Sequence, residues 1–170
     1  ETALSGYLQE DIPYALLQSL QSYNAAALIG GARYAGKPGS YTFYNTAFYI
    51  TPEGITQMYD KIHLFPFGEY FPLGFIDILQ LRYGNRRQYT PGDRYTVFES
   101  PAGSFATVIC FEILFSDLMR RFIDRDTDFI VNISNDAWFG QTSAHYQHFA
   151  MSVLRAVEFW LDERIPRAIP

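Results

Sequence analysis

The sequence predicts an α/β fold in which helices cover one face of a mixed β-sheet. Segments of strand length, rich in apolar and β-branched residues, alternate with segments whose apolar residues recur at helical spacing. Two pairs of strand-like segments also flank short turns, as antiparallel hairpins do. Hydrophobic residues make up 48% of the 170 residues and aromatic residues 18%, so we expect one domain over residues 1–170 with its own core.

The first half of the chain is expected to hold a helix and three strands. Pro13 suits the first turn of a helix, and apolar residues follow it at helical spacing. The expected elements are, in order, a helix over residues 14–23, a strand over 25–34, a Gly/Pro turn over 35–40, and a hairpin with strands over 41–50 and 56–60.

Residues 63–92 break this alternation, because proline and glycine recur throughout the stretch. We expect a long irregular loop there, and long loops in compact domains are often functional. The loop is also unusually apolar, so it is either a satellite core or a lid that contacts lipid or covers acyl chains. The residues that carry this alternative are Phe65, Phe67, Tyr70, Phe71, Phe75 and Ile76.

The second half is expected to contain a second hairpin followed by helices around a buried strand. Apolar residues on one face and arginines near its end predict an amphipathic helix after the hairpin. The expected elements are strands over residues 94–99 and 104–110, a helix over 113–124, a strand over 128–133, a polar loop over 134–141 and a long helix over 142–163.

The only cysteine, Cys110, ends an expected strand shortly before an expected helix begins. A lone cysteine is either a buried apolar thiol or a reactive one. A strand end that leads into a helix exposes a side chain at the sheet edge, and the helix start favours the reactive thiolate. Cys110 is therefore a candidate nucleophile. No spacing pairs it with His63, His145 or His148, although a Cys–His–Asn arrangement is one alternative.

A series of motifs over residues 59–158 resembles the nitrilase superfamily, and within it the apolipoprotein N-acyltransferase family. Residues 59–70, YDKIHLFPFGEY, look like the lysine motif of the superfamily, in the form found in the acyltransferases. Residues 108–112, VICFE, look like the nucleophile motif. The match continues through NISNDAWFG at 132–140, QH at 147–148 and LRAVE at 154–158, and the opening Glu1-Thr2-Ala3 is similar to the second half of the glutamate motif.

The resemblance implies a fold and a catalytic site. The implied fold is the αββα sandwich of the superfamily, with mixed sheets. The family's catalytic residues map onto Glu1 as general base, Cys110 as nucleophile, Lys61 as oxyanion stabiliser and Glu69, which orients the lysine and the base. The backbone N–H of Phe111 is expected to share the oxyanion with Lys61.

Three further residues are expected around substrate. Glu112 is either a helix-start charge favoured by the dipole or part of the site, since the family also has an acid at this position. Trp138 and Phe139 are expected to line an acyl pocket, with a place in the core as the alternative.

The implied reaction is transfer of a fatty acyl chain from phospholipid to the N-terminal amine of a lipid-modified cysteine on a lipoprotein. It would proceed by a ping-pong mechanism through S-acyl-Cys110, with no metal or organic cofactor. The expected partners are the phospholipid donor, the lipoprotein acceptor and a membrane, with the domain on the periplasmic or extracellular side of the bacterial inner membrane. The net charge of −5 gives no reason to expect a nucleic acid partner.

The sequence departs from the family in three ways, and we expect it to be a fragment of the domain. No strand precedes Glu1, residues 159–170 do not reproduce the family's next strand, and no membrane segment flanks the motifs. Two rival functions remain open. One is a soluble amidase or nitrilase that uses the same residues with water as acceptor, and the other is a non-catalytic domain that keeps the fold.

Overall fold

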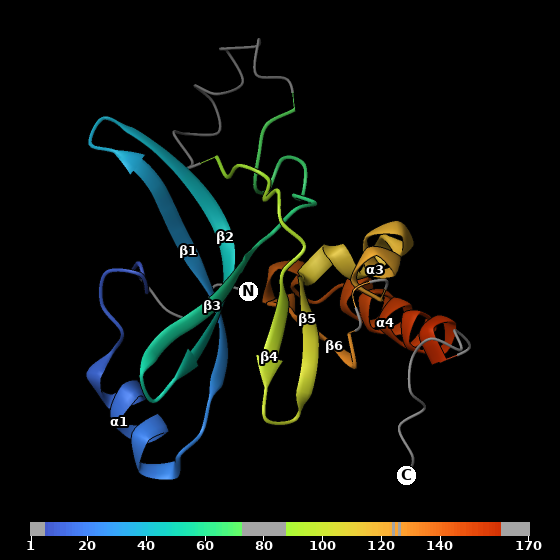
Figure 1. Ribbon diagram of the computed structural model, residues 1–170. Helices are drawn as coiled ribbons and strands as arrows, with labels where there is room; N and C mark the ends of the chain where they lie inside the picture. Colours follow the sequence, from blue (N-terminus) through green and yellow to red (C-terminus); the bar gives the residue numbers. More distant parts are fainter. Residues whose placement is uncertain (1–5, 73–87, 124, 126, 161–170) are drawn as a thin grey trace.

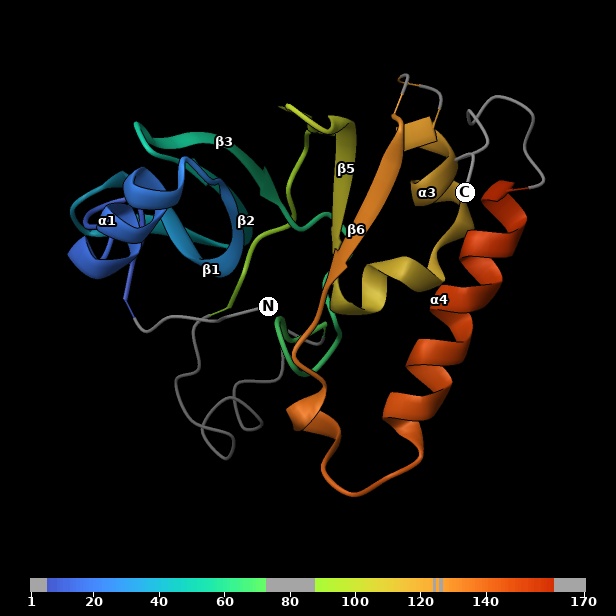
Figure 2. The same ribbon diagram turned by 90° about the horizontal axis from the view of Figure 1, so that it is seen from below.

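The computed structural model describes residues 6–72, 88–123, 125 and 127–160, and within this part the chain forms four layers (Figure 1). The outer layer on one side is α1 (Tyr14–Tyr23), which packs on a sheet of β1 (Ala27–Lys37), β2 (Ser40–Thr51) and β3 (Gly54–Asp60). A second sheet contains β4 (Val97–Ser100), β5 (Gly103–Ile109) and β6 (Phe129–Ile133). The far layer is α3 (Ser116–Ile123) and α4 (Ala144–Trp160), so the helix–sheet–sheet–helix order of the sandwich is visible in Figure 2.

The strands form two sheets where the residue pattern alone predicted one mixed sheet. Each hairpin pairs within itself and starts a sheet of its own. The first sheet is antiparallel throughout, whereas β6 adds to β5 in parallel, in the order β4-β5-β6. A parallel neighbour needs a crossover connection, and α3 lies in that connection. The αββα sandwich expected from the family resemblance is confirmed.

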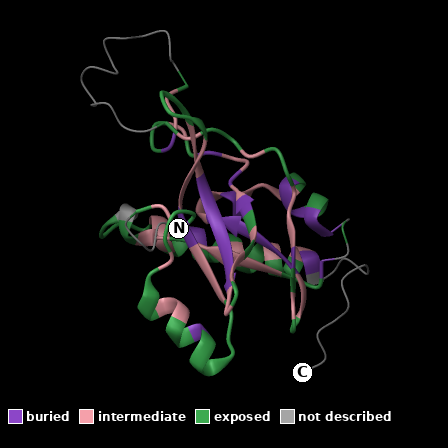
Figure 3. Cartoon of the chain, turned by 60° about the vertical axis from the view of Figure 1, so that its left-hand side comes forward, coloured by how far each residue is buried: buried purple, intermediate pink, exposed green. Residues whose placement is uncertain are grey.

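Alternating side chains of β2 explain why the first sheet is covered on both faces. Phe48 and Ile50 point toward α1 and pack with Leu20, while Ala47 and Tyr49 point toward the second sheet. The inner cluster is the larger one and continues through both sheets to α3 and the end of α4. Figure 3 shows the result, with the buried segments in the central strands and most of α1 exposed.

Element bounds differ from expectation at strands and at helices. The turn expected over 35–40 is shorter, because β1 continues to Lys37 and β2 begins at Ser40, and the strand expected over 94–99 begins only at Val97. The helix over 14–23 is confirmed, but the single helix expected over 113–124 is wrong. A 3₁₀ turn, η1 (Cys110–Leu114), comes first, and α3 starts only after Phe115, whose φ of −92° and ψ of 96° are extended. The polar loop over 134–141 contains a second 3₁₀ turn, η2 (Asp136–Phe139). No helix among the described residues is both long enough and apolar enough to cross a membrane.

Candidate functional site

A buried carboxylate ties the lysine motif to the cysteine motif. Glu112, in η1, is fully buried. Its Oε1 accepts hydrogen bonds from the Tyr59 hydroxyl at 2.8 Å and from the backbone N–H groups of Ile62 at 2.8 Å and His63 at 2.9 Å. Its Oε2 accepts one from the N–H of Ile109 at 2.8 Å. Since Ile62 follows Lys61 and Ile109 precedes Cys110, one side chain holds the neighbours of both residues in place.

Burial and hydrogen bonding act in opposite directions on this carboxylate. Burial raises the pKa of Glu112 above its ordinary value, and the hydrogen bonds from Ile109, His63 and Tyr59 lower that pKa in part. Burial also raises the pKa of Tyr59, so its phenol keeps the proton that it donates to Glu112. With protein donors on both oxygens, Glu112 contributes to the site by bracing it, and the expected contact with substrate stays a prediction.

Lys61 forms a buried ion pair at the end of β3. Its Nζ lies 2.8 Å from Glu69 Oε2, and the Lys61 side chain is 0% exposed. An ammonium has three N–H groups, and apart from this ion pair Nζ has no hydrogen-bond partner among the described residues. The ammonium therefore keeps N–H groups for a further acceptor. A buried cation of this kind is held in place by its paired carboxylate.

Glu69 is fixed in turn by two donors that the sequence analysis did not single out as site residues. Its Oε1 accepts a hydrogen bond from Asn45 Nδ2 at 2.5 Å, and its Oε2 accepts one from the N–H of Phe65 at 2.6 Å. Asn45 lies on β2, and its own carbonyl accepts the N–H of Lys61 at 2.8 Å. The structure thus brings Lys61 and Glu69 together, while their catalytic roles stay predictions.

Residues 88–92, here called the strap, are attached by their backbone to both residues of this ion pair. Three backbone hydrogen bonds attach the strap: Tyr89 N–H to Glu69 O at 2.9 Å, Thr90 N–H to Phe43 O at 2.7 Å and Gly92 N–H to Lys61 O at 2.8 Å. The fit at Gly92 is close, because a Cβ added there would come within 2.2 Å of the Asp60 carbonyl oxygen.

Cys110 lies where the sequence analysis expected it, at the junction of a strand and a helical turn. β5 ends at Ile109 and η1 begins at Cys110. The φ angle of Cys110 is +53°, in the left-handed region that non-glycine residues rarely occupy. Such a conformation costs ~1–2 kcal/mol for an L-residue, so the surrounding structure must hold it. Strained residues of this kind cluster at functional sites.

The structure also reveals a histidine that no spacing in the sequence connected to Cys110. His148 lies on α4, is 8% exposed, and has its Nε2 3.0 Å from the backbone carbonyl oxygen of Cys110. Its Nδ1 lies 3.1 Å from Asp136 Oδ1, in η2. The only available signal was indirect, since Asp136 and His148 belong to the two motifs that follow the cysteine motif.

Several expected site residues are described in part or not at all. Glu1, Phe75 and Ile76 lie outside the described residues. Trp138 and Phe139 fall in η2, but their side chains are likewise outside the description. Among the described residues, no group of three His, Cys, Asp or Glu side chains could hold a metal ion.

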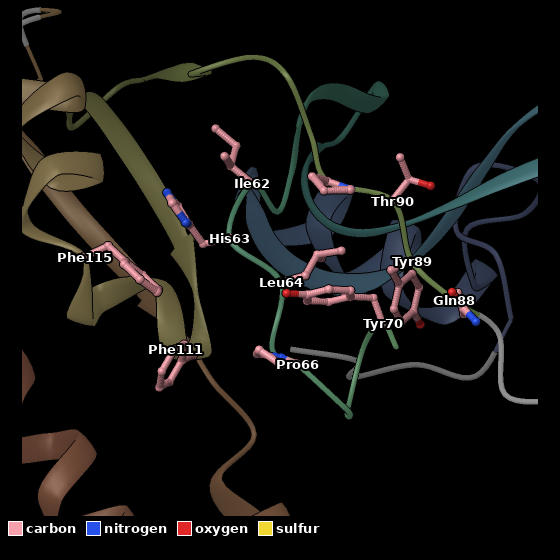
Figure 4. Close-up of a pocket in the computed structure, with 11 residues that line it drawn as sticks. Ile62, His63, Leu64, Pro66, Tyr70, Gln88, Tyr89, Thr90, Phe111 and Phe115 are labelled. Carbon is pink, nitrogen blue, oxygen red and sulfur yellow. The ribbon is translucent and has the colours of Figure 1, made fainter. Parts of the chain in front are cut away.

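A pocket of about 470 Å³ lies beside the cysteine motif. Phe111 and Phe115 form one side of it, and Tyr70 and Tyr89 face them across the opening (Figure 4). On the phenylalanine side, Phe65 and Phe115 both pack edge-on against Phe111, at 5.2 and 5.4 Å between centroids. The other lining residues are Ile62, His63, Leu64, Pro66, Gln88, Thr90 and Pro91.

Comparison with known proteins agrees with these motifs. A sequence model of the carbon-nitrogen hydrolase family matches residues 2–160. The apolipoprotein N-acyltransferase of Geobacter metallireducens is 34% identical over 165 residues, which cover 93% of this chain and 31% of that protein. Apolipoprotein N-acyltransferase 1 of Treponema pallidum is 38% identical over 126 residues, covering 68% of this chain and 22% of that protein. The chain thus spans less than a third of the length of these relatives.

A solved structure supports the fold independently of sequence identity. A carbon-nitrogen hydrolase from Helicobacter pylori G27 superposes with a TM-score of 0.60 at 14% identity, covering 84% of this chain and 46% of that chain. At this identity the likeness concerns the fold alone.

Proposed function

The chain belongs to the carbon-nitrogen hydrolase family, and on that premise we propose that it transfers a fatty acyl chain from a phospholipid to the N-terminal amine of a diacylglyceryl-cysteine lipoprotein. The observation that carries the proposal is the connection made by Glu112, which binds the residue after Lys61 and the residue before Cys110. A buried ammonium and a strained cysteine held by one brace suit a thiol nucleophile beside an oxyanion site. The named N-acyltransferase relatives support the choice of reaction.

The first half of the proposed reaction acylates the cysteine. The Glu1 carboxylate takes the thiol proton, and the Cys110 sulfur attacks the ester carbonyl carbon of the phospholipid. The tetrahedral oxyanion is bound by Lys61 Nζ and the N–H of Phe111. The C–O bond to the glycerol oxygen then breaks, and that oxygen leaves with the proton from Glu1 as a lysophospholipid. The acyl chain remains on Cys110 as a thioester.

The second half transfers the acyl chain to the amine. The neutral amine of the lipoprotein attacks the thioester carbonyl, and the same two donors bind the second oxyanion. The C–S bond breaks, an amide forms, and the amine's proton returns through Glu1 to the thiol. Every bond broken has a partner formed within the two half-reactions, so no oxidant, reductant or cofactor is required.

The pocket beside Phe111 supports an apolar acyl substrate. It falls within the usual 300–1,000 Å³ of small-molecule sites. Aromatic rings form much of its wall, with few charged groups among its lining residues. Phe65 and Phe67 of the adjoining loop are 42% and 64% exposed, as expected of a loop that contacts lipid. We place the domain at a membrane surface, on the periplasmic or extracellular side, in line with its lipid substrates.

The proposal is tested by intact mass spectrometry of the full-length protein incubated with phospholipid vesicles. We expect a mass increase of one acyl group that hydroxylamine removes and that Cys110→Ser abolishes. Lys61→Met is expected to lower the acylation rate by roughly 10²–10³-fold, as loss of an oxyanion donor does. Lys37→Met is the matched control, because Lys37 is the only other lysine and is exposed.

Two outcomes would contradict the proposal in different ways. Absence of any acyl adduct in the wild-type protein would remove the nucleophile role of Cys110. If water hydrolyses the acyl adduct as fast as the amine of an N-terminal lipopeptide accepts the acyl group, the protein would instead be a hydrolase that uses the same site.

A further inference from the structure

His148, on α4, is nearly buried and has an oxygen atom close to each ring nitrogen. The ring is nearly buried against η1, and each of its nitrogens faces an oxygen, Cys110 O at 3.0 Å and Asp136 Oδ1 at 3.1 Å. A backbone carbonyl oxygen only accepts, so the contact with Cys110 is a hydrogen bond that Nε2–H donates, while Nδ1 lies against the Asp136 carboxylate. Asp136 is fixed in turn, since the Ser134 hydroxyl donates to the same oxygen at 2.5 Å. The ring is therefore held at both ends.

The carbonyl oxygen that His148 contacts belongs to the peptide unit that also carries the N–H of Phe111. The carbonyl of Cys110 and the N–H of Phe111 are two ends of one planar trans peptide, so they point in opposite directions. Fixing the carbonyl toward α4 consequently aims the Phe111 N–H away from α4. This N–H belongs to the first turn of η1, where N–H groups lack a partner within the helix.

Cys110 also needs an external contact to keep its conformation. Its φ of +53° is unfavourable for a non-glycine residue, and such a residue persists only when the surroundings hold it. Ile109, on the preceding side, is held by Glu112. On the following side, the contact with His148 holds the carbonyl. The backbone of Cys110 is thus held on both sides, by Glu112 through Ile109 and by His148 at the carbonyl.

We propose that His148, oriented by Asp136, is a positioning residue for acylation: it holds the peptide unit that presents the Phe111 N–H to the oxyanion on Cys110. This inference rests on the proposed function, because it assigns a role within the same site. His148 forms no bond with substrate and takes no proton from the thiol in this role, so the two half-reactions are unchanged.

The test separates positioning of the oxyanion donor from activation of the thiol. His148→Leu removes the donor, whereas His148→Gln restores a single N–H at the position of Nε2. Each full-length variant is assayed for its rate of acylation by phospholipid vesicles and for its rate of alkylation by iodoacetamide, which needs the thiol but no oxyanion. Circular dichroism and thermal unfolding establish that each variant folds. His145→Gln, on the same helix, is the matched control.

We expect His148→Leu to lower the acylation rate by roughly 10²–10³-fold, with alkylation within about twofold of wild type and His148→Gln in between. Wild-type acylation by His148→Leu would overturn the inference. Equal loss of acylation and alkylation in a folded variant would also overturn it, because it would make His148 the base for the thiol. If phospholipid does not acylate the wild-type protein, the proposed function fails. The positioning role is then tested separately by the rate at which the same variants hydrolyse p-nitrophenyl butyrate, with the same expected losses and the same contradicting outcomes.

Discussion

Glu112 shows how much of the site depends on one side chain. Its carboxylate joins two segments far apart in the sequence, namely residues 59–63 at and after the end of β3, and the end of β5 at Ile109. Four donors on one buried carboxylate leave little freedom for any of them. The cost of burying the group is offset by these hydrogen bonds and by the nearby charge of Lys61.

Replacement of Glu112 by Gln is expected to destabilise the protein by about 1–3 kcal/mol. The shape is kept, but the amide nitrogen of Gln would face a backbone N–H, which leaves at least one buried donor without an acceptor. Chemical denaturation with urea measures the free energy of unfolding. Asp117→Asn, an exposed acid in the first turn of α3, is the control and should change it by less than about 0.5 kcal/mol. Equal effects of the two substitutions would refute the bracing role.

At the scale of elements, the strap of residues 88–92 is bonded to the backbone of the lysine motif at two points. It contributes no regular helix or strand, yet its backbone binds the carbonyls of both Lys61 and Glu69. These two residues form the ion pair, so a shift of the strap would move both ends of it together. Gly92 is the point of closest approach, because it faces the carbonyl of Asp60.

A methyl group at Gly92 is therefore expected to separate the strap from β3. Gly92→Ala should lower the free energy of unfolding by about 1–3 kcal/mol, as overpacking does, and should slow acylation of Cys110 by displacing Lys61. Thermal unfolding and the mass-spectrometric assay measure the two effects. Gly31→Ala is the control, since its new methyl first meets a Phe48 ring atom at 3.4 Å, a contact that a side chain can relieve. Unchanged stability in Gly92→Ala would mean that the strap has room to move.

At the scale of the whole molecule, local pattern predicted the elements better than their assembly. Helix α1 and the junction at Cys110 follow from periodicity and turn residues within a short window. The division into two sheets does not, because strand pairing depends on contacts that periodicity does not encode. The resemblance to a family supplied that part of the prediction.

The same limit applies to the candidate site. A lysine at a strand end is ordinarily a solvated charge, and only the motif around Lys61 predicted otherwise. The partners that hold the site are remote in sequence: Glu112 binds residues 49 and 50 positions away, and His148 contacts a residue 38 positions away. Spacing along one chain cannot predict such contacts. Asn45 was missed for the same reason, since 24 residues separate it from Glu69.

His63 follows the first sheet and contacts Phe115 beside α3, and we expect its protonation to lower the stability of the fold. Its ring stacks on Phe115 at 4.3 Å between centroids, and burial, together with the charge of Arg121 on α3, lowers its pKa below the ordinary 6.5. Between that lowered pKa and 6.5 the unfolded chain binds a proton that the folded chain does not, so the free energy of unfolding falls as the pH drops. Above 6.5 this contribution is fully present.

The substitution His63→Phe keeps an aromatic ring against Phe115 but removes the titrating group. The free energy of unfolding of this variant, measured in urea, should therefore fall less between pH 7 and pH 5 than that of the wild type. For each protein, the free energy of unfolding is expressed relative to its own value at pH 8. If the two free energies then change in parallel with pH, protonation of His63 does not oppose folding.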